Sequence, residues 1–319
     1  MSVWLAAAFG SLAYADQAAA SRRNEEGLRL LDANQAREAE QRFRAALHED
    51  PNNVEVLNNL GVTLKRERNF TAAVEVLRRA AKIAPKDARI RSNLGSALHS
   101  VGDFKSAVSE LTAAAALAPS NRDIVRTFGY CSRDYGIDLY RQGRFEASVA
   151  ALRQASKILP EDSAVHYNLG RALARLGRKQ ESASELSIAE EQNRKSRDAI
   201  RAKSLNNEGN KLLQAGDLKQ GLERLASAVS LAPDDPISRY NYGVALLLAN
   251  RVDEGIEQLR DSISLDRNQG NAHYYLGRAL MLKAEWNSAI DSLTEAVRLN
   301  PADQSADAAL QEASKRIGH

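Results

Sequence analysis

The stretch Val54–Asp87 reads VEVLNNLGVTLKRERNFTAAVEVLRRAAKIAPKD, and it decides the fold because its outline recurs along the chain. Its Gly61 precedes its Pro85 by an offset that five further pairs share. Most neighbouring pairs follow one another at a period of about 34 residues, which is typical of stacked copies of one small motif. The other pairs are Gly27/Pro51, Gly95/Pro119, Gly136/Pro160, Gly209/Pro233 and Gly277/Pro301.

Alignment of the copies on glycine and proline gives columns at helical spacing. In the copy quoted above, Leu57, Leu60, Gly61 and Leu64 occupy positions four, seven, eight and eleven, which share one face of a helix. Glycine at eight and alanine at twenty let two helices approach closely, and leucine or phenylalanine at twenty-four fills the space beside them. Proline then ends the second helix. Each copy therefore predicts a pair of helices.

These columns follow the pattern W-x2-L-G-x2-Y…A-x3-F…P, with leucine in place of several aromatic residues. By them the chain resembles the tetratricopeptide repeat family over roughly nine-tenths of its length. The resemblance implies an all-α fold, a right-handed α-solenoid of about eight helix pairs within 16–303, with a capping helix over 304–319. The repeats are expected near 20–53, 54–87, 88–121, 122–162, 163–196, 202–235, 236–269 and 270–303.

The fourth repeat is longer than the others. It carries two glycines, Gly129 and Gly136, at a spacing of two helical turns. We therefore expect Arg122–Phe128 to add two turns to its first helix.

The junction of the fifth and sixth repeats lacks the glycine and proline residues that end helices elsewhere in the chain. Arg194 stands where proline is expected, and Arg178–Glu208 contains neither glycine nor proline. Either one long helix joins the two repeats, or a polar turn forms near Asn193–Ser196. A mechanical seam is expected at 196–201.

The N-terminus carries an apolar run, Val3–Leu12, followed by Ala13-Tyr14-Ala15 before Asp16. This small-x-small arrangement is typical of a signal cleavage site, and the run is too short to span a bilayer. Met1-Ser2 supplies no basic residue for such a signal, so a capping helix is the alternative. Residues 1–15 therefore predict export to the periplasm or the extracellular space, with a cytoplasmic protein as the alternative.

The charge balance argues against nucleic acid as a partner. The net charge is +3, from 44 basic and 41 acidic residues. One local basic cluster has no interleaved aromatic residues that could stack on bases, and a solvated outer face explains it better. The cluster comprises Arg78, Arg79, Lys82, Lys86, Arg89 and Arg91.

Catalytic and metal-binding patterns are not found in the sequence. Cys131 is the single thiol and is read as a small packing residue. The histidines are scattered over different repeats without metal-ligand spacing, and no phosphate-binding glycine loop occurs. We therefore expect a protein that is not an enzyme and that takes no cofactor and no metal. The histidines are His48, His99, His166, His273 and His319.

A column of asparagines at position six is the strongest functional signal. Position six lies about 200° around the helix from positions four and eight, so its side chains point away from the buried stripe. The column resembles the asparagine ladder of the O-linked N-acetylglucosamine transferase superhelix, which grips extended peptides on its concave face. A carboxamide can pair with both the N–H and the C=O of a guest backbone. The alternative is a hydrogen bond to a neighbouring helix. The column comprises Asn59, Asn93, Asn168, Asn207 and Asn241.

Aromatic and basic residues flank this column. Tyrosine recurs at position five and arginine at positions nine and thirteen, and these residue types are the commonest anchors of interfaces. A groove lined by them would suit an extended segment with aromatic or acidic side chains. A plain solvated surface is the alternative. The predicted anchors are Tyr167, Tyr240, Tyr274, Arg171, Arg175 and Arg278.

A chaperone-tail clamp is incomplete in this chain. Asn206 and Asn210 match its amide part, but Asn271 and Tyr275 stand where its distal cations belong. The sequence therefore predicts a scaffold that binds an extended polypeptide in the concave groove. The alternatives are a self-associating or convex-face docking module and an accessory subunit of an enzyme complex. Partner identity and oligomeric state do not follow from these residues.

Overall fold

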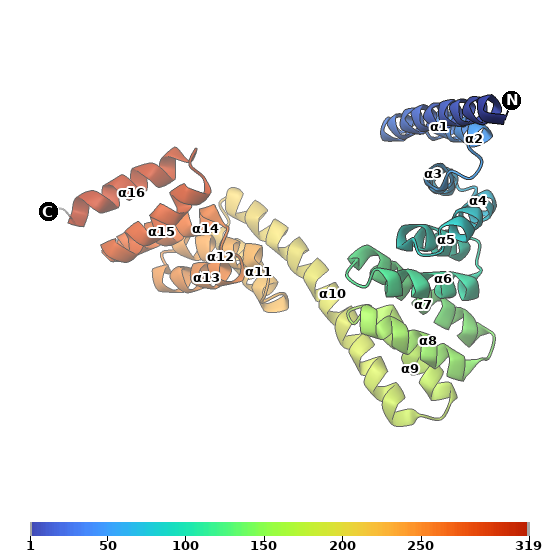
Figure 1. Cartoon of the computed structure of the whole chain (residues 1–319). Helices are drawn as coiled ribbons and strands as arrows, with labels where there is room; N and C mark the ends of the chain where they lie inside the picture. Colours follow the sequence, from blue (N-terminus) through green and yellow to red (C-terminus); the bar gives the residue numbers. More distant parts are fainter. Residues whose placement is uncertain (1, 318–319) are drawn as a thin grey trace. The chain divides into compact units, whose positions relative to one another are not determined.

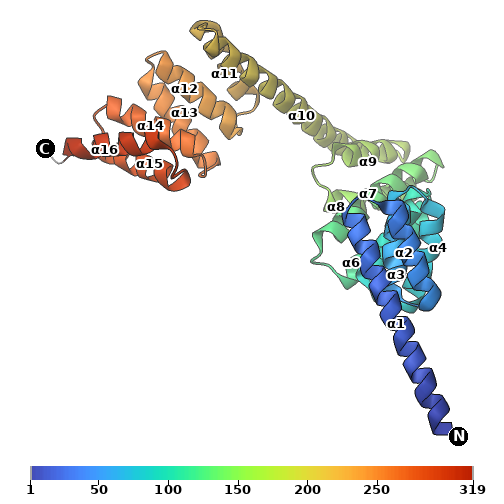
Figure 2. The ribbon, with the colours of Figure 1, turned by 90° about the horizontal axis from the view of Figure 1, so that it is seen from above.

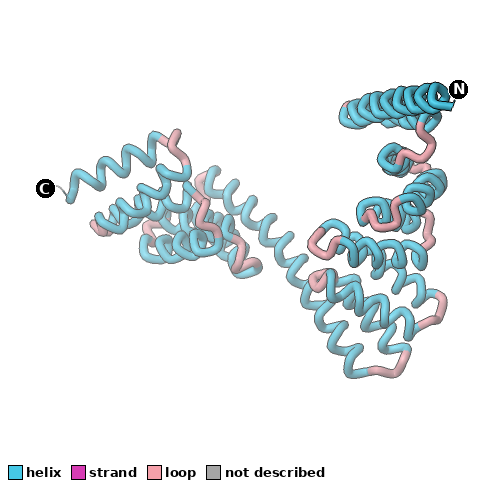
Figure 3. Tube along the Cα trace, viewed as in Figure 1, coloured by secondary structure: helices cyan, strands magenta, loops and turns pink. Residues whose placement is uncertain are grey.

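The computed structural model describes the backbone of residues 2–317 and the side chains of residues 17–317. Within that range the chain forms sixteen α-helices and no strand (Figures 1 and 3). The all-α solenoid predicted from the repeat columns is confirmed. The helices are α1 (Ser2–Asp32), α2 (Ala36–Glu49), α3 (Val54–Arg66), α4 (Phe70–Ile83), α5 (Ala88–Ser100), α6 (Phe104–Leu117), α7 (Arg122–Arg141), α8 (Phe145–Ile158), α9 (Ser163–Arg175), α10 (Lys179–Gln214), α11 (Leu218–Leu231), α12 (Pro236–Leu248), α13 (Val252–Leu265), α14 (Gly270–Leu282), α15 (Trp286–Leu299) and α16 (Gln304–Ile317).

The chain divides into two compact units, residues 1–192 and residues 193–319. Within each unit, consecutive helices pack in chain order, from α1 to α9 in the first and from α11 to α16 in the second. The first helices of neighbouring repeats also touch, as in α3 with α5 and α12 with α14. The second helices do not approach one another in the described part of the chain. The first helices therefore form the closer-spaced row, which is the inner side of a curved stack.

Helices α3 and α4 show how the columns hold a repeat together. A Cβ atom at Gly61 would lie 2.4 Å from Cγ of Leu77, so only glycine permits this approach. Leu77, Ala73 and Ala80 are fully buried at the contact. Burial of a leucine of this kind contributes about 1.5–3 kcal/mol. The second unit repeats the arrangement, with Leu293 over Gly277.

The turns between repeats are closed by side-chain caps. Asp87 Oδ1 accepts hydrogen bonds from the N–H groups of Arg89 and Ile90 at the start of α5, and Asn53 caps α3 in the same way. Each cap stands two residues after the repeat's proline, where it satisfies N–H groups that the helix leaves free. The other caps of this kind are Asn121, Asp162, Asp235 and Asp303.

Helix α7 has 20 residues, against 13 in α5. The two turns predicted from the second glycine are therefore present. A Cβ atom at Gly129 would lie 2.8 Å from Cγ2 of Ile158 and 2.9 Å from Cγ of Leu159, so the added turns pack on the end of α8.

Helix α10 runs without interruption through 36 residues (Figure 2). The long-helix alternative is therefore correct, and no polar turn forms near Asn193–Ser196. Its N-terminal part packs on α9 through Leu186 and Gly170, and its C-terminal part packs on α11 through Gly209 and Leu225. One helix thus provides the second helix of the fifth repeat and the first helix of the sixth. The division between the compact units falls after Gln192, slightly before the expected seam at 196–201.

The ends of the chain are both helical. Helix α1 begins at Ser2, so the predicted signal segment continues into the first repeat as one helix. The side chains of residues 2–16 lie outside the described residues, and export stays a prediction. At the other end, α16 packs on α15 through Ala309 and Ala313, which lie with Leu293 in one buried cluster.

Candidate peptide-binding face

The asparagine column lies on the row of first helices, and three of its members pair with the preceding repeat. Asn59 Nδ2 donates to Asn24 Oδ1 at 2.9 Å. The same bond recurs from Asn93 to Asn58 at 2.7 Å and from Asn241 to Asn206 at 3.0 Å. The acceptors Asn24, Asn58 and Asn206 all stand at position five and are 8%, 2% and 6% exposed.

This pairing gives the column a structural role that the sequence interpretation treated only as an alternative. A buried carboxamide without a hydrogen-bond partner lowers stability by about 1–3 kcal/mol. Each position-six asparagine therefore stabilises the buried position-five asparagine of the preceding repeat. The pair also sets the register of two neighbouring first helices. Asn59, Asn93 and Asn241 are half-buried, and each keeps its Oδ1 and a second N–H for other partners.

The two remaining asparagines differ from these three. Asn168 donates to the carbonyl of Ala164 at 2.8 Å, within its own helix. Asn207 is exposed on α10. Asn168 belongs to the first compact unit, and Asn207 and Asn241 belong to the second. The five carboxamides are therefore not equivalent, because neither Asn168 nor Asn207 pairs with the preceding repeat.

The predicted anchors of the first unit form stacked pairs. The Arg171 guanidinium lies 4.7 Å from the ring centroid of Tyr140 and 5.5 Å from that of Tyr167. Arg175 lies 4.7 Å from the ring centroid of Phe145. Tyr167 is 48% exposed, so its ring is open to a guest on the side away from Arg171. Stacking holds each arginine in place, and Arg171 also donates one N–H to the Tyr140 hydroxyl at 3.4 Å.

The anchors of the second unit form an aromatic cluster. Tyr240 and Tyr275 stand at positions five and six of neighbouring repeats, where the first unit has paired asparagines, and their ring centroids are 6.0 Å apart. Tyr274 packs edge to face on Tyr275, and Arg278 donates to the Tyr274 hydroxyl at 3.1 Å. Burial, together with Tyr275, raises the pKa of Tyr240 to about 12. This hydroxyl therefore stays protonated at physiological pH.

Two hollows on the first helices are lined by different residue types. In the first unit, a hollow of ≈ 350 Å³ beside Asn93 is lined by polar groups, among them Lys65 and Ser96. Lys65 Nζ donates to Ser96 Oγ at 2.8 Å, and burial lowers the pKa of this lysine. In the second unit, a hollow of ≈ 210 Å³ is lined mainly by apolar and aromatic groups: Val244, Leu247, Leu248, Tyr274, Tyr275 and Leu282.

Sequence reasoning missed Leu248 and Leu282, which are 64% and 71% exposed. Both occupy position thirteen, where first-unit repeats have arginines such as Arg66 and Arg175. The missed signal was that position thirteen carries arginine in repeats of the first unit and leucine in the last two repeats. It could have been found by comparing position thirteen between the halves of the chain.

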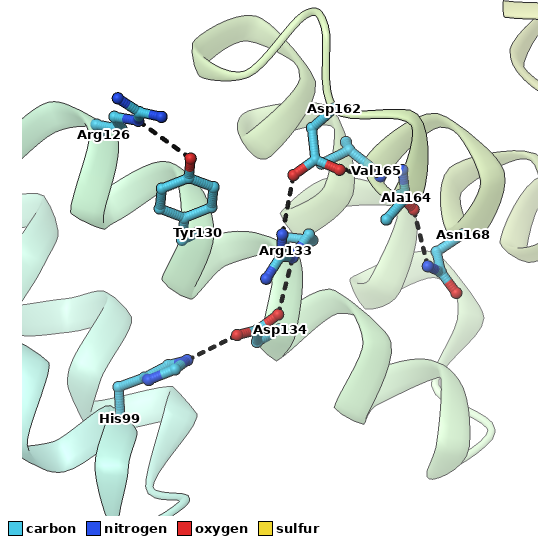
Figure 4. A network of polar contacts seen from close by, with 9 residues as sticks. All are labelled: His99, Arg126, Tyr130, Arg133, Asp134, Asp162, Ala164, Val165 and Asn168. Carbon is cyan, nitrogen blue, oxygen red and sulfur yellow. Dashed lines mark hydrogen bonds and ion pairs between the residues drawn. The ribbon is translucent and has the colours of Figure 1, made fainter. Parts of the chain in front are cut away.

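A charged network replaces the asparagine pair at the extended fourth repeat (Figure 4). Asp134, at position six, lies 2.8 Å from His99 Nε2 and accepts from Arg133 at 2.9 Å. Arg133 also donates to Asp162 at 2.9 Å, the residue that caps α9. Burial alone would raise the pKa of Asp134, but the hydrogen bonds from His99 and Arg133 hold it below its usual value. Hydrogen bonds of this network therefore connect α5, α7 and the cap of α9.

The described residues contain no cluster of three or more metal-ligating side chains. Burial, with a smaller effect of Asp134, raises the pKa of Cys131 to about 12, so this thiol is not a nucleophile at neutral pH. Both ring nitrogens of His166 are hydrogen-bonded, Nδ1 with Glu185 Oε2 at 2.6 Å and Nε2 with the carbonyl of Pro160 at 2.9 Å, so this histidine has a structural role. His319 lies outside the described residues.

Comparison with known families settles the identity of the repeats. Models of the tetratricopeptide repeat match residues 30–95, 88–121, 134–197 and 206–269, together more than half of the chain. The chain belongs to the tetratricopeptide repeat family. Proteins of this family are typically interaction modules. No curated protein matches the sequence, and no described helix has the length and apolar character needed to cross a membrane.

Several solved tetratricopeptide structures resemble parts of the chain. One is a crystal structure of MamA, with 22% identity, a TM-score of 0.45, and coverage of 55% of this chain and 91% of MamA. A MamA from Desulfovibrio magneticus RS-1 gives 21% identity, a TM-score of 0.44, and coverage of 55% and 95%. The first tetratricopeptide domain of Spaghetti (RPAP3), bound to the HSP90 peptide SRMEEVD, gives 17% identity, a TM-score of 0.37, and coverage of 38% and 96%.

Proposed function

We propose that this protein is a non-enzymatic scaffold that binds an extended polypeptide segment along the row of first helices. The observation that supports this most lies within the first unit, where exposed Tyr167 and stacked Arg171 stand on α9 together with the carboxamide of Asn168. Pre-positioned hydrogen-bonding and aromatic groups reduce the ordering cost of binding a flexible chain. The guest would bind through its backbone and through aromatic or acidic side chains.

The paired asparagines change how such a guest would be held. Asn59, Asn93 and Asn241 each spend one N–H on the preceding repeat, so they would offer mainly a carbonyl oxygen to the guest's N–H groups. A two-pronged contact from these positions would require breaking the inter-repeat bond. A single hydrogen bond adds about 0.5–1.5 kcal/mol. Tyrosine and arginine contacts must therefore supply most of the affinity and selectivity.

Variants that spare the structural pairs test this function. The full-length triple variant Asn168→Ala/Asn207→Ala/Arg171→Ala removes contacts at positions without an inter-repeat carboxamide bond. The matched control, Lys105→Ala/Gln154→Ala/Lys157→Ala, changes three exposed residues of second helices. We expect capture of partners by chemical cross-linking to fall about fivefold or more for the first variant only, as for central anchors of an interface.

The outcome separates the proposal from its alternatives. Equal capture by both variants and the wild type would contradict binding on the first helices. Loss with the control alone would favour docking through the outer face. A mass in solution that doubles with concentration, and is unaffected by either variant, would favour self-association.

Localisation is a separate proposal. We propose that residues 1–15 direct export and are removed before Asp16. Sequencing the N-terminus of the protein from fractionated cells tests it: a chain that begins at Asp16 outside the cytoplasm supports export, and a retained Met1 or Ser2 contradicts it.

A further inference from the structure

The two added turns of α7 border a third hollow, which lies outside the asparagine column. With ≈ 750 Å³ it is larger than either hollow described above. Val125 and Tyr130 of α7 line one wall, and Ile158 and Leu159 at the end of α8 line another. The size and the apolar lining are typical of a site that receives a side chain or a small ligand. None of the residues predicted for peptide binding contributes to it.

The wall on α7 carries two arginines without a carboxylate partner. Arg122 and Arg126 stand one turn apart, are exposed, and make no ion pair with any other residue of the described 17–317 segment. Arg126 Nε donates to the Tyr130 hydroxyl at 3.0 Å, and its guanidinium lies 5.6 Å from that ring's centroid (Figure 4). Both arginines line the hollow beside its apolar residues, so it has a cationic edge.

The acidic groups of the hollow are not equivalent. Asp162 is neutralised by Arg133 and also caps α9. Glu161 is exposed and makes no ion pair among the described residues. The hollow therefore has a cationic side on α7 and one free carboxylate on the opposite side, so a ligand carboxylate is favoured only beside Arg122 and Arg126.

We propose that this hollow binds a bulky apolar side chain of a partner polypeptide with a carboxylate next to it. The apolar side chain packs against Val125, Ile158 and Leu159, and the carboxylate pairs with Arg122 and Arg126. Removing the apolar side chain from water drives binding, and the arginines select acidic neighbours and orient the segment. The fourth repeat thus holds a contact point that regular repeats, lacking the added turns, cannot form.

Peptide probes test the proposal directly. The first is a fluorescent ten-residue glycine-serine peptide with one phenylalanine between two glutamates. Two matched probes replace the phenylalanine by serine or the glutamates by glutamine. We expect the full-length protein to bind the first probe at least tenfold more tightly than either matched probe, as measured by fluorescence anisotropy. Equal binding of all three would overturn the proposal.

Charge variants identify the site. Arg122→Glu/Arg126→Glu should weaken binding of the first probe about tenfold or more, and Glu161→Lys should strengthen it about threefold. The control Lys105→Glu/Lys219→Glu makes the same change in net charge at exposed positions elsewhere and should leave binding within about twofold. Equal weakening by the control and the test variant would overturn the proposal.

Position is checked by a probe in which p-benzoyl-phenylalanine replaces the phenylalanine. Light-induced adducts should map to residues 122–130 and 158–163. Adducts confined to α3, α5 or α9 would overturn the proposal while leaving the function assigned to the first helices intact. If binding along the asparagine column is disproved but adducts still map to residues 122–130, the hollow at the fourth repeat remains supported.

Discussion

The first helices of the two compact units share one backbone design but differ in surface chemistry. In the first unit, Asn24 pairs with Asn59 and Asn58 with Asn93, and position thirteen carries arginine in three of the five repeats. In the last two repeats of the second unit, the corresponding pair is Tyr240 with Tyr275, and position thirteen carries Leu248 and Leu282. The repeat columns fix the scaffold, and a few exposed positions fix what each unit can bind.

The largest expected effect tests the shared scaffold. Leu77→Ala in the first unit and Leu259→Ala in the second each remove a fully buried side chain packed on a glycine. Each should lower the local free energy of unfolding by about 2–5 kcal/mol. Hydrogen exchange of the full chain, resolved by helix, measures both. If the free energy of unfolding falls in one unit only, the two units are not held together in the same way.

The paired asparagines provide the next test. Asn58→Ala removes a buried acceptor that Asn93 uses, and should destabilise the first unit by about 1–3 kcal/mol. The matched change Asn207→Ala, at an exposed position, should stay within about 0.5 kcal/mol. Urea denaturation followed by helix-resolved exchange distinguishes them. If both changes cost the same, the inter-repeat bond does not stabilise the stack.

Exchanging leucine and arginine at position thirteen should shift the binding preference of one unit toward that of the other. Leu248→Arg/Leu282→Arg should weaken binding of an uncharged, leucine-bearing peptide about tenfold, because the apolar hollow loses its exposed wall. The reverse variant, Arg66→Leu/Arg175→Leu, should not weaken it. Isothermal titration provides the dissociation constants, and an unchanged constant for the first variant would contradict the assigned difference.

Backbone strain offers a smaller effect. Ala284 and Arg68 adopt left-handed backbone with φ of 58° and 64°, at turns where other repeats have Gly102 or Gly177. Ala284→Gly should raise the stability of the second unit by up to about 1 kcal/mol, and Gly177→Ala should lower that of the first by a similar amount. Thermal unfolding measures the shifts, and a destabilised Ala284→Gly variant would refute the argument.

The smallest expected effect concerns acid. Because the pKa of Asp134 is held below its usual value, its stabilising contribution is complete above the unfolded pKa of about 4 and is lost as pH falls through the lower folded pKa. Asp134→Asn should remove this part of the acid sensitivity of the first unit, as measured by circular dichroism between about pH 5 and pH 2. An unchanged acid profile would show that the network contributes nothing.

Much of the fold follows from spacing, because glycine at position eight and proline at the repeat end impose the helix pair. The caps two residues after each proline were also visible in the sequence, since Asn53 and Asp87 are strong helix starters. The length of α10 stayed open because no local signal separates a polar turn from a polar helix. Its continuity is decided by packing at both ends, through Gly170 and Gly209.

The binding face was harder to predict. The column at position six was identified, but the roles of Asn24 and Asn58 were not, because these roles depend on how neighbouring repeats align. Such a contact joins residues 35 positions apart and requires the three-dimensional register. The hollow at the fourth repeat was not predicted for a similar reason. The added turns were predicted, but the cavity depends on how they pack against the end of α8.

Site-specific photo-cross-linking tests the central claim, that an extended guest binds on the first helices. The cross-linker replaces Tyr167 on α9 in one full-length protein and Lys105 on α6 in another, so that one lies on each row. The account predicts abundant adducts with unstructured polypeptide segments from position 167 and few from position 105. Equal yields from both positions, or adducts from position 105 alone, would contradict it.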